Sequence, residues 1–319
     1  MTPDHPRPPL PQPVIAGGPI ASVLTGGPTR DRGLVADLAE RRGSRKPRRN
    51  ALVDVVMQGP VSPYALAILG GVEDAAWRLG VDLVLSAAGD RAGHGWLDRV
   101  GGHDTAGVLL LRTSPTADAW AWLAGRGIPA VFVDPRRKPP PEVPVVVSAN
   151  RAGAKAAVAH LIGLGHERVA VITGRPGVPC GVDRLAGYRD AMAEAGLPTW
   201  SACGYFQTGL ARRATLDLLN RLPEPPTAIF ACSDAMAVGV YEALAERGLS
   251  IPGDVSVVGF DDAPVAAGVT PALTTVRQPW PDLGATALTT LLSGGSPALV
   301  ELPTTLLTRS STAGAAPRI

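Results

Sequence analysis

Acidic residues stand directly after two apolar runs of the chain. Ser233-Asp234 follows the run 228–231, and Asp261-Asp262 follows the run 255–260. Residues 236–247 between them have helical spacing, so the segment predicts one strand–helix–strand unit of a parallel sheet. Ligands of open α/β sheets bind at the carboxyl ends of the strands, which predicts that these carboxylates hold a ligand. Helix capping is the alternative, because aspartate is also preferred before a first helical turn.

Strand-like runs alternate with helical patterns along the rest of the chain, which predicts an α/β fold made of repeated βαβ units. Strands are expected at 51–56, 81–86, 107–111, 130–133, 145–147, 169–173 and 202–205, and an extended segment at 300–308. Helices are expected at 64–79, 96–101, 116–125, 153–164, 184–195, 211–220 and 280–292.

The whole-chain composition limits the class of protein. The 319 residues, of which 45% are hydrophobic, suffice for two medium cores, so we expect two lobes. No apolar run approaches the ~20 residues that span a bilayer, and prolines occupy the place of a signal peptide's apolar core, so a cytoplasmic protein without a membrane partner is expected. Three scattered cysteines predict reduced thiols, with no disulfide framework, metal or other cofactor.

Positive charge is concentrated near the N-terminus. Residues 1–50 hold nine Lys/Arg against four Asp/Glu, whereas the remaining residues hold 21 against 24. A basic run precedes the first expected strand and consists of Arg41, Arg42, Arg45, Lys46, Arg48 and Arg49. Such a run can neutralise DNA phosphates and release counterions. The alternative is a solvated linker.

Four segments in a fixed order carry a family resemblance. They are residues 145–174, 183–197 (DRLAGYRDAMAEAGL), 228–264 and 273–279 (LTTVRQP). Together they resemble the lactose-repressor (LacI/GalR) family of bacterial transcription regulators, over about residues 52–312. The resemblance implies a type I periplasmic-binding-protein fold, in which two Rossmann-like lobes are joined by three crossovers and a small-molecule effector lies in the cleft.

The resemblance also implies a division of the chain. Residues 1–50 form a Pro-rich and then basic segment, and residues 313–319 form a tail. The first lobe takes residues 51–149 and 279–298, and the second lobe takes 150–278 and 299–312. The crossovers are expected near Asn150, 276–279 and Ala298.

Three charged residues of the second lobe match effector contacts of the family. In the family, the positions that match Asp234 and Asp261 carry carboxylates that accept hydrogen bonds from ligand hydroxyls. One carboxylate can hold a vicinal diol. Arg184 matches an arginine that reaches into the cleft; a surface arginine at a helix start is the alternative. The implied effector is a mono- or oligosaccharide.

Aromatic residues are candidates for stacking on a sugar ring. Tyr64 (in SPYA) lies where relatives carry an aromatic that lines the cleft, and Phe206 follows a strand of the second lobe. For both, burial in the core is the alternative. Arg112, Ser114 and Asp134 follow strands of the first lobe and are candidates by position.

Two further candidates lie at the expected crossovers. Asn150 follows Ala149, where relatives often carry aspartate, and this departure bears on effector preference. Gln278 faces either the ligand or the hinge between the lobes.

Motifs of common enzymes are absent from the sequence. It contains no GxSxG elbow, no GxxxxGK[ST] phosphate loop, no GxGxxG and no HExxH. We therefore expect a binding protein and not an enzyme.

The N-terminal 50 residues resemble an incomplete helix-turn-helix. Residues 20–27 (IASVLTGG, with Ser22) resemble the end of a recognition helix, 28–43 a third helix and 45–50 the start of a hinge. Six prolines within residues 1–13 exclude the first helix, so a short, partly disordered, basic helical segment is expected. Its expected DNA contacts are Ser22, Arg45, Lys46, Arg48 and Arg49.

Two functions stay open at this point. The first is a LacI-type regulator, acting as a repressor, whose effector modulates binding to operator DNA. It would be a homodimer that pairs through the helices starting near Tyr64 and Met236. The second is a sugar-binding protein of the same fold that has lost sequence-specific DNA binding.

Overall fold

The computed structural model describes residues 51–58, 62–88, 95–295 and 298–315. The expectations for residues 1–50, including the DNA contacts from Ser22, Arg45, Lys46, Arg48 and Arg49, lie outside this part of the chain. Within it, no helix has both the length and the apolar character needed to cross a membrane.

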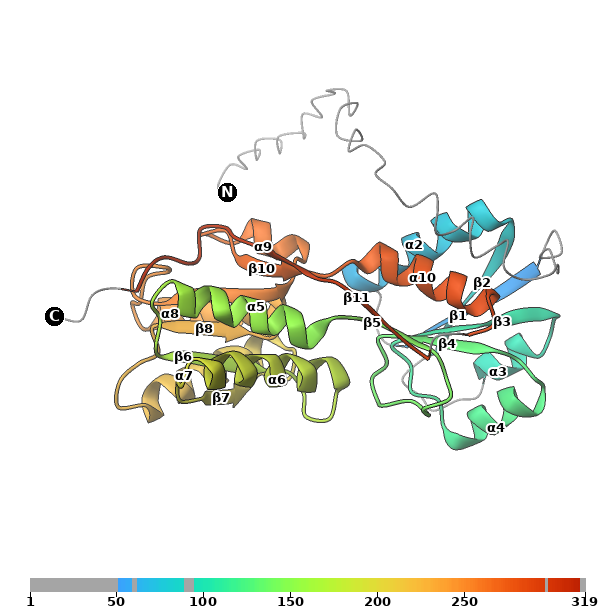
Figure 1. The fold of residues 1–319 in the computed structure, drawn as a ribbon, viewed down its shortest axis with the longest axis horizontal. Helices are drawn as coiled ribbons and strands as arrows, with labels where there is room; N and C mark the ends of the chain where they lie inside the picture. Colours follow the sequence, from blue (N-terminus) through green and yellow to red (C-terminus); the bar gives the residue numbers. More distant parts are fainter. Residues whose placement is uncertain (1–50, 59–61, 89–94, 296–297, 316–319) are drawn as a thin grey trace, which may run out of the picture. The chain divides into compact units, whose positions relative to one another are not determined.

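The first lobe is a six-stranded parallel sheet between two layers of helices (Figure 1). Its strands, in the order β11-β5-β4-β3-β1-β2, are Leu299–Leu302, Val145–Ser148, Ala130–Val133, Thr105–Leu111, Ala51–Gln58 and Val81–Ala88. Helices α2 (Pro63–Leu79) and α10 (Trp280–Leu292) cover one face, where Val53 and Leu109 are buried. Helices α3 (Gly95–Val100) and α4 (Ala117–Gly125) cover the other.

The second lobe repeats this plan with one antiparallel strand. Its strands, in the order β12-β10-β9-β8-β6-β7, are Thr305–Leu307, Thr274–Arg277, Ser256–Asp261, Ala228–Ala231, Val169–Thr173 and Trp200–Cys203. Strand β12 runs antiparallel to β10. The helices are α5 (Asn150–Gly163), α6 (Pro179–Glu194), α7 (Thr208–Arg221), α8 (Asp234–Glu246) and α9 (Pro264–Gly268). The α/β fold with two lobes built on parallel sheets is thereby confirmed.

The chain passes between the sheets three times. Two passages lie at Ala149, between β5 and α5, and at residues 278–279, between β10 and α10, close to the expected positions. The third lies at residues 303–304, between β11 and β12, and not near Ala298. Residues 299–302 belong to the first lobe, because β11 pairs with β5 from Leu299↔Val145 to Leu302↔Ser148. The sequence did not distinguish β11 from β12, because β11 is a short edge strand whose residues are alternately exposed and half-buried and therefore form no apolar run.

Helices that neighbour each other pack backbone against backbone at glycines. A Cβ atom on Gly284 of α10 would lie 2.1 Å from the carbonyl oxygen of Ile68 in α2. A Cβ atom on Gly187 of α6 would lie 2.2 Å from the carbonyl oxygen of Arg151 in α5. Both distances are far below van der Waals contact, so these interfaces require glycine.

We expect Gly284→Ala to lower the free energy of unfolding by about 1–3 kcal/mol, because the added methyl group forces α2 and α10 apart. Urea denaturation measures this change. Gly70→Ala is the matched control, since Gly70 lies in α2 with nothing within 4 Å of the added Cβ. This control should leave stability unchanged or raise it slightly, because alanine favours helix. Equal losses in the two variants would argue against close packing at Gly284.

A buried histidine holds the C-terminal segment against the second lobe. His166 Nε2 lies 3.0 Å from both the Ala313 carbonyl oxygen and the Ser256 hydroxyl, and Nδ1 lies 3.1 Å from the Thr227 hydroxyl. Burial lowers the pKa of His166, and it also lowers the pKa of His160, which contacts Thr312. Both rings therefore favour the neutral form in the folded chain.

Stability is consequently expected to fall as the pH drops below about 6.5, the ordinary pKa of histidine. As the pH falls, these histidines are protonated in the unfolded chain before they are protonated in the folded chain, so protonation favours the unfolded state. The loss of stability continues until the pH falls below the pKa of the histidines in the folded state. Urea denaturation between pH 8 and 5 tests this. The His166→Gln variant should show a shallower loss over this range; parallel curves for variant and parent would show that His166 does not contribute.

Candidate functional site

A cavity of about 410 Å³ lies between the two lobes, where the strands of both sheets have their carboxyl ends. This volume falls within the range of small-molecule sites, ~300–1,000 Å³. The first lobe contributes Met57, Gln58, Ser62, Tyr64, Leu111, Arg112, Asp134, Arg136 and Trp280 to its wall. The second lobe contributes Cys180, Arg184, Phe206, Ser233, Ala235, Asp261 and Ala263, and Gln278 comes from a passage between the lobes.

Strained backbone is concentrated around this cavity. Six non-glycine residues of the described part have positive φ angles, and all of them end or follow strands β3, β4, β7 or β9: Arg112, Asp134, Tyr205, Phe206, Asp261 and Asp262. Each such conformation costs ~1–3 kcal/mol and persists only where the surroundings hold it. Four of the six side chains line the cavity, so the strain accompanies the placement of site residues.

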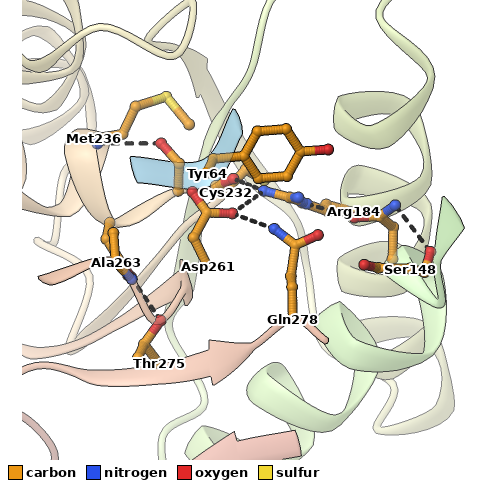
Figure 2. Close-up of polar contacts among 12 residues, drawn as sticks. Tyr64, Ser148, Arg184, Cys232, Met236, Asp261, Ala263, Thr275 and Gln278 are labelled. Carbon is orange, nitrogen blue, oxygen red and sulfur yellow. Dashed lines mark hydrogen bonds and ion pairs between the residues drawn. The ribbon is translucent and has the colours of Figure 1, made fainter. Parts of the chain in front are cut away.

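A chain of hydrogen bonds joins Arg184 and Asp261 to two passages between the lobes (Figure 2). Arg184 Nη1 donates to Asp261 Oδ1 over 3.0 Å and to the Cys232 carbonyl oxygen over 2.7 Å. Its Nε donates to Asn150 Oδ1 over 2.8 Å, at the first passage. Gln278, at the second passage, donates from Nε2 to the same Asp261 oxygen over 2.6 Å. One carboxylate is thus connected to two of the three passages between the lobes, which act as hinges.

The second oxygen of Asp261 is available to a ligand. Asp261 Oδ1 accepts both hydrogen bonds just described, and Oδ2 has no partner among the described residues. Burial raises the pKa of Asp261, while the neighbouring Arg184 and the hydrogen bonds to it lower that pKa. The guanidinium of Arg184 also lies 3.8 Å from the centroid of the Phe260 ring, which holds it in place. Arg184 is buried and is not the surface arginine of the alternative interpretation.

Asp234 does not line the cavity, contrary to expectation. Its side chain is fully buried, and its oxygens accept from the Thr275 hydroxyl over 2.6 Å and from the Ala263 amide over 2.7 Å. Burial is the main cause that raises the pKa of Asp234, and the nearby negative charge of Asp261 raises it further. Asp234 therefore holds the turn after β9. The preceding Ser233 lines the cavity and caps α8 through the Met236 amide.

Polar and aromatic groups form the wall of the first lobe. The Tyr64 hydroxyl donates to Asp134 Oδ2 over 2.8 Å. The Tyr64 ring meets Trp280 edge to face, with centroids 5.3 Å apart, and the Arg112 guanidinium lies 5.2 Å from its centroid. Tyr64 is in the first turn of α2, which begins there because Ser62 accepts from the Ala65 amide and Pro63 suits the first position.

Phe206 provides the aromatic surface of the second lobe. A Cβ atom on Gly174 would lie 2.0 Å from Phe206 Cζ, so the ring rests directly on the glycine backbone. Rings from both lobes therefore border the cavity: Tyr64 and Trp280 on one side and Phe206 on the other.

Besides Asp234, two further predicted residues lie outside the cavity wall, and several lining residues were not predicted. Asn150 is buried between Arg184 and the Ser148 carbonyl oxygen, where it positions the arginine. The Ser114 hydroxyl is buried without a hydrogen-bond partner among the described residues. Unpredicted lining residues include Cys180, Ser233, Arg136 and Trp280. Burial raises the pKa of the Cys180 thiol to about 12, so this thiol stays neutral.

The chain is similar to known regulators. Residues 158–312 match the family model of a periplasmic binding protein-like domain. The HTH-type transcriptional regulator CelR of Thermobifida fusca is 33% identical over 262 residues, which are 78% of this chain and 76% of CelR. The HTH-type transcriptional regulator reg1 of Streptomyces lividans is 31% identical over 341 residues, covering 94% of each chain.

Solved structures show the same similarity. The structure of the regulator CelR in complex with cellobiose has a TM-score of 0.73 and 31% identity, over 82% of this chain and 86% of that one. A LacI transcriptional regulator from a Rhodococcus species has a TM-score of 0.73 and 30% identity, over 83% of this chain and 99% of that one.

Proposed function

The chain belongs to the LacI family of transcriptional regulators, and we propose that a sugar bound in the cavity between its lobes controls its binding to operator DNA. The observation that carries this proposal is that Asp261 Oδ2 has no partner among the described residues and lies in a cavity bordered by aromatic rings from both lobes. Sugar hydroxyls donate to a carboxylate, and the apolar face of the sugar ring stacks on an aromatic side chain. The cellobiose complex of CelR supports this ligand class.

The connection of Asp261 to two hinges provides a route to the response. A ligand that contacts both Asp261 and the first-lobe wall binds more tightly when the lobes are closed than when they are open. It therefore shifts the equilibrium toward the closed arrangement, and the difference between its two binding free energies sets the size of the shift. The proposed role is repression that the effector modulates, in the cytoplasm and without catalysis.

A thermal-shift screen of mono- and disaccharides, including cellobiose, tests the ligand class. A ligand that binds the folded state at 100 times its Kd stabilises that state by about 2.7 kcal/mol, which gives a clear rise in Tm. Isothermal titration calorimetry then establishes the stoichiometry. Failure of all sugars to raise Tm would count against the proposal.

DNA binding needs its own experiment, because the first 50 residues carry it in this proposal. The match to reg1 covers 94% of this chain and so extends into that segment. Fluorescence anisotropy of the full chain with its own upstream DNA, at several salt concentrations, should show sequence-specific binding that changes on adding the sugar. Binding that depends steeply on salt but not on sequence would favour a sugar-binding protein without an operator, an alternative that the six N-terminal prolines keep open.

We further propose that the active form is a homodimer that pairs through α2 and α8. Two apolar side chains of α2 are exposed: Leu66 is 54% and Trp77 is 83% accessible. Exposed apolar groups on one helix are typical of an interface. Sedimentation equilibrium should give a dimer, and Trp77→Glu should shift the mass toward the monomer.

A further inference from the structure

Two arginines of the first-lobe wall donate no hydrogen bond to any residue that the structure describes. Arg136 lines the cavity, is partly buried, and has no hydrogen bond or ion pair with any described residue. Arg112 lies 3.8 Å from Asp134 Oδ2, which is too far for a hydrogen bond. Both guanidinium groups carry N–H donors that make no hydrogen bond to a described residue, so this wall is suited to receiving acceptor oxygens from a ligand.

The other charged groups of the cavity already make hydrogen bonds within the protein. Arg184 donates to Asn150, to the Cys232 carbonyl oxygen and to Asp261. Asp134 accepts from the Tyr64 hydroxyl. Three arginines and two aspartates line the cavity, which leaves one positive charge in excess. The unsatisfied groups of the first-lobe wall are therefore positively charged donors.

The side chains of Arg112 and Arg136 start from neighbouring strands. Arg112 follows β3 and Arg136 comes three residues after β4, and these strands pair at Leu111↔Val133. Arg112 has a φ angle of 51° and lies over the Tyr64 ring, so it is already held in place. The exposed Arg137 and Lys138 follow directly and add positive potential on the same loop.

We propose that the effector is an anionic sugar, whose carboxylate or phosphate binds Arg112 and Arg136 while its hydroxyls face Asp261 and Gln278. This inference rests on the proposed function, since it names the subclass of sugar that the same cavity takes. A carboxylate and a phosphate share the fork of acceptor oxygens that guanidinium groups bind. A neutral sugar would leave these donors without a charged acceptor, so the cavity should select against it.

Calorimetric titration with matched sugars tests the proposal. One set consists of glucose, glucuronate and glucose 6-phosphate, and a second of galactose, galacturonate and galactose 6-phosphate. We expect the anionic member of one set to bind about 10- to 100-fold tighter than its neutral parent, since hydrogen bonds to charged groups are the stronger ones. Comparison of the uronate with the phosphate identifies which anion the site prefers.

Two variants and a control locate the effect. Arg136→Gln and Arg112→Gln should each weaken binding of the anionic sugar at least about tenfold, with less than about threefold change for the neutral parent. Arg137→Gln, an exposed neighbour outside the cavity wall, should keep the preference. Urea denaturation of each variant verifies that the chain remains folded.

The possible failures can be told apart. If neutral parents bind as tightly as the anions, or if both arginine variants keep the preference, the anionic effector is excluded while a sugar effector stands. If no member of either set and no sugar of the thermal-shift screen binds, the proposed function fails together with this inference.

Discussion

Asp261→Asn is expected to weaken sugar binding about 100-fold while the chain stays folded. Asparagine has the same shape, and its Oδ1 can still accept from Arg184 and Gln278. The free carboxylate oxygen becomes an amide that donates, so it no longer accepts from a sugar hydroxyl. The loss of charge further weakens each hydrogen bond that the ligand donates. Titration calorimetry with the sugar found in the screen measures the loss.

Asp190→Asn is the matched control for this experiment. Asp190 lies on α6, as Arg184 does, and pairs with Arg151 outside the cavity. An exposed ion pair contributes little to stability, and its removal should leave sugar affinity unchanged. If Asp261→Asn binds the sugar as tightly as the parent chain, Asp261 is not a ligand contact, and the assignment of the site to this carboxylate is wrong.

The strands were predictable because buried parallel strands are continuous apolar runs. The runs 130–133, 169–173 and 228–231 coincide with β4, β6 and β8, whose residues are almost entirely buried. Strand β10 was not expected, since it is four residues long and begins with two threonines that hydrogen-bond inside the protein. Apolar patterning therefore identifies the core strands and misses a short strand that begins with polar residues.

Predicting the site residues was harder, because strand ends identify a neighbourhood but not the direction of a side chain. Ser233 and Asp234 are adjacent at the end of β8, yet Ser233 lines the cavity and Asp234 points into the protein toward Thr275 and Ala263. That difference follows from where α8 begins and from its packing against the turn after β9. Arg136 was missed for a related reason: its place in the wall depends on the path of the loop after β4.

The hinge residues show what tertiary structure adds. Asn150 and Gln278 were expected near crossovers, and both are there. Asn150 is connected to Asp261 through Arg184, whereas Gln278 donates to Asp261 directly. These bonds join α6, β9 and two passages between the lobes, and no local pattern in the sequence encodes them. A residue that contacts no ligand, such as Asn150, can therefore still influence the response.

Arg184→Met is expected to lower the free energy of unfolding by about 3–5 kcal/mol, the largest effect on stability of the variants considered. Methionine fills much of the arginine's volume but donates nothing, so the Cys232 carbonyl oxygen and Asn150 lose their donor. The Asp261 carboxylate is left near the buried Asp234 without a cation that bonds to it. Urea denaturation at pH 7.5 measures the loss.

The double variant Arg184→Met/Asp261→Asn separates the ion pair from packing. Most of the loss in Arg184→Met should come from an uncompensated buried charge, and asparagine removes that charge. We therefore expect the double variant to be more stable than Arg184→Met alone, with a coupling free energy of about 1–3 kcal/mol. Additive effects would mean that Arg184 stabilises the lobe through the Cys232 carbonyl, Asn150 and Phe260 instead.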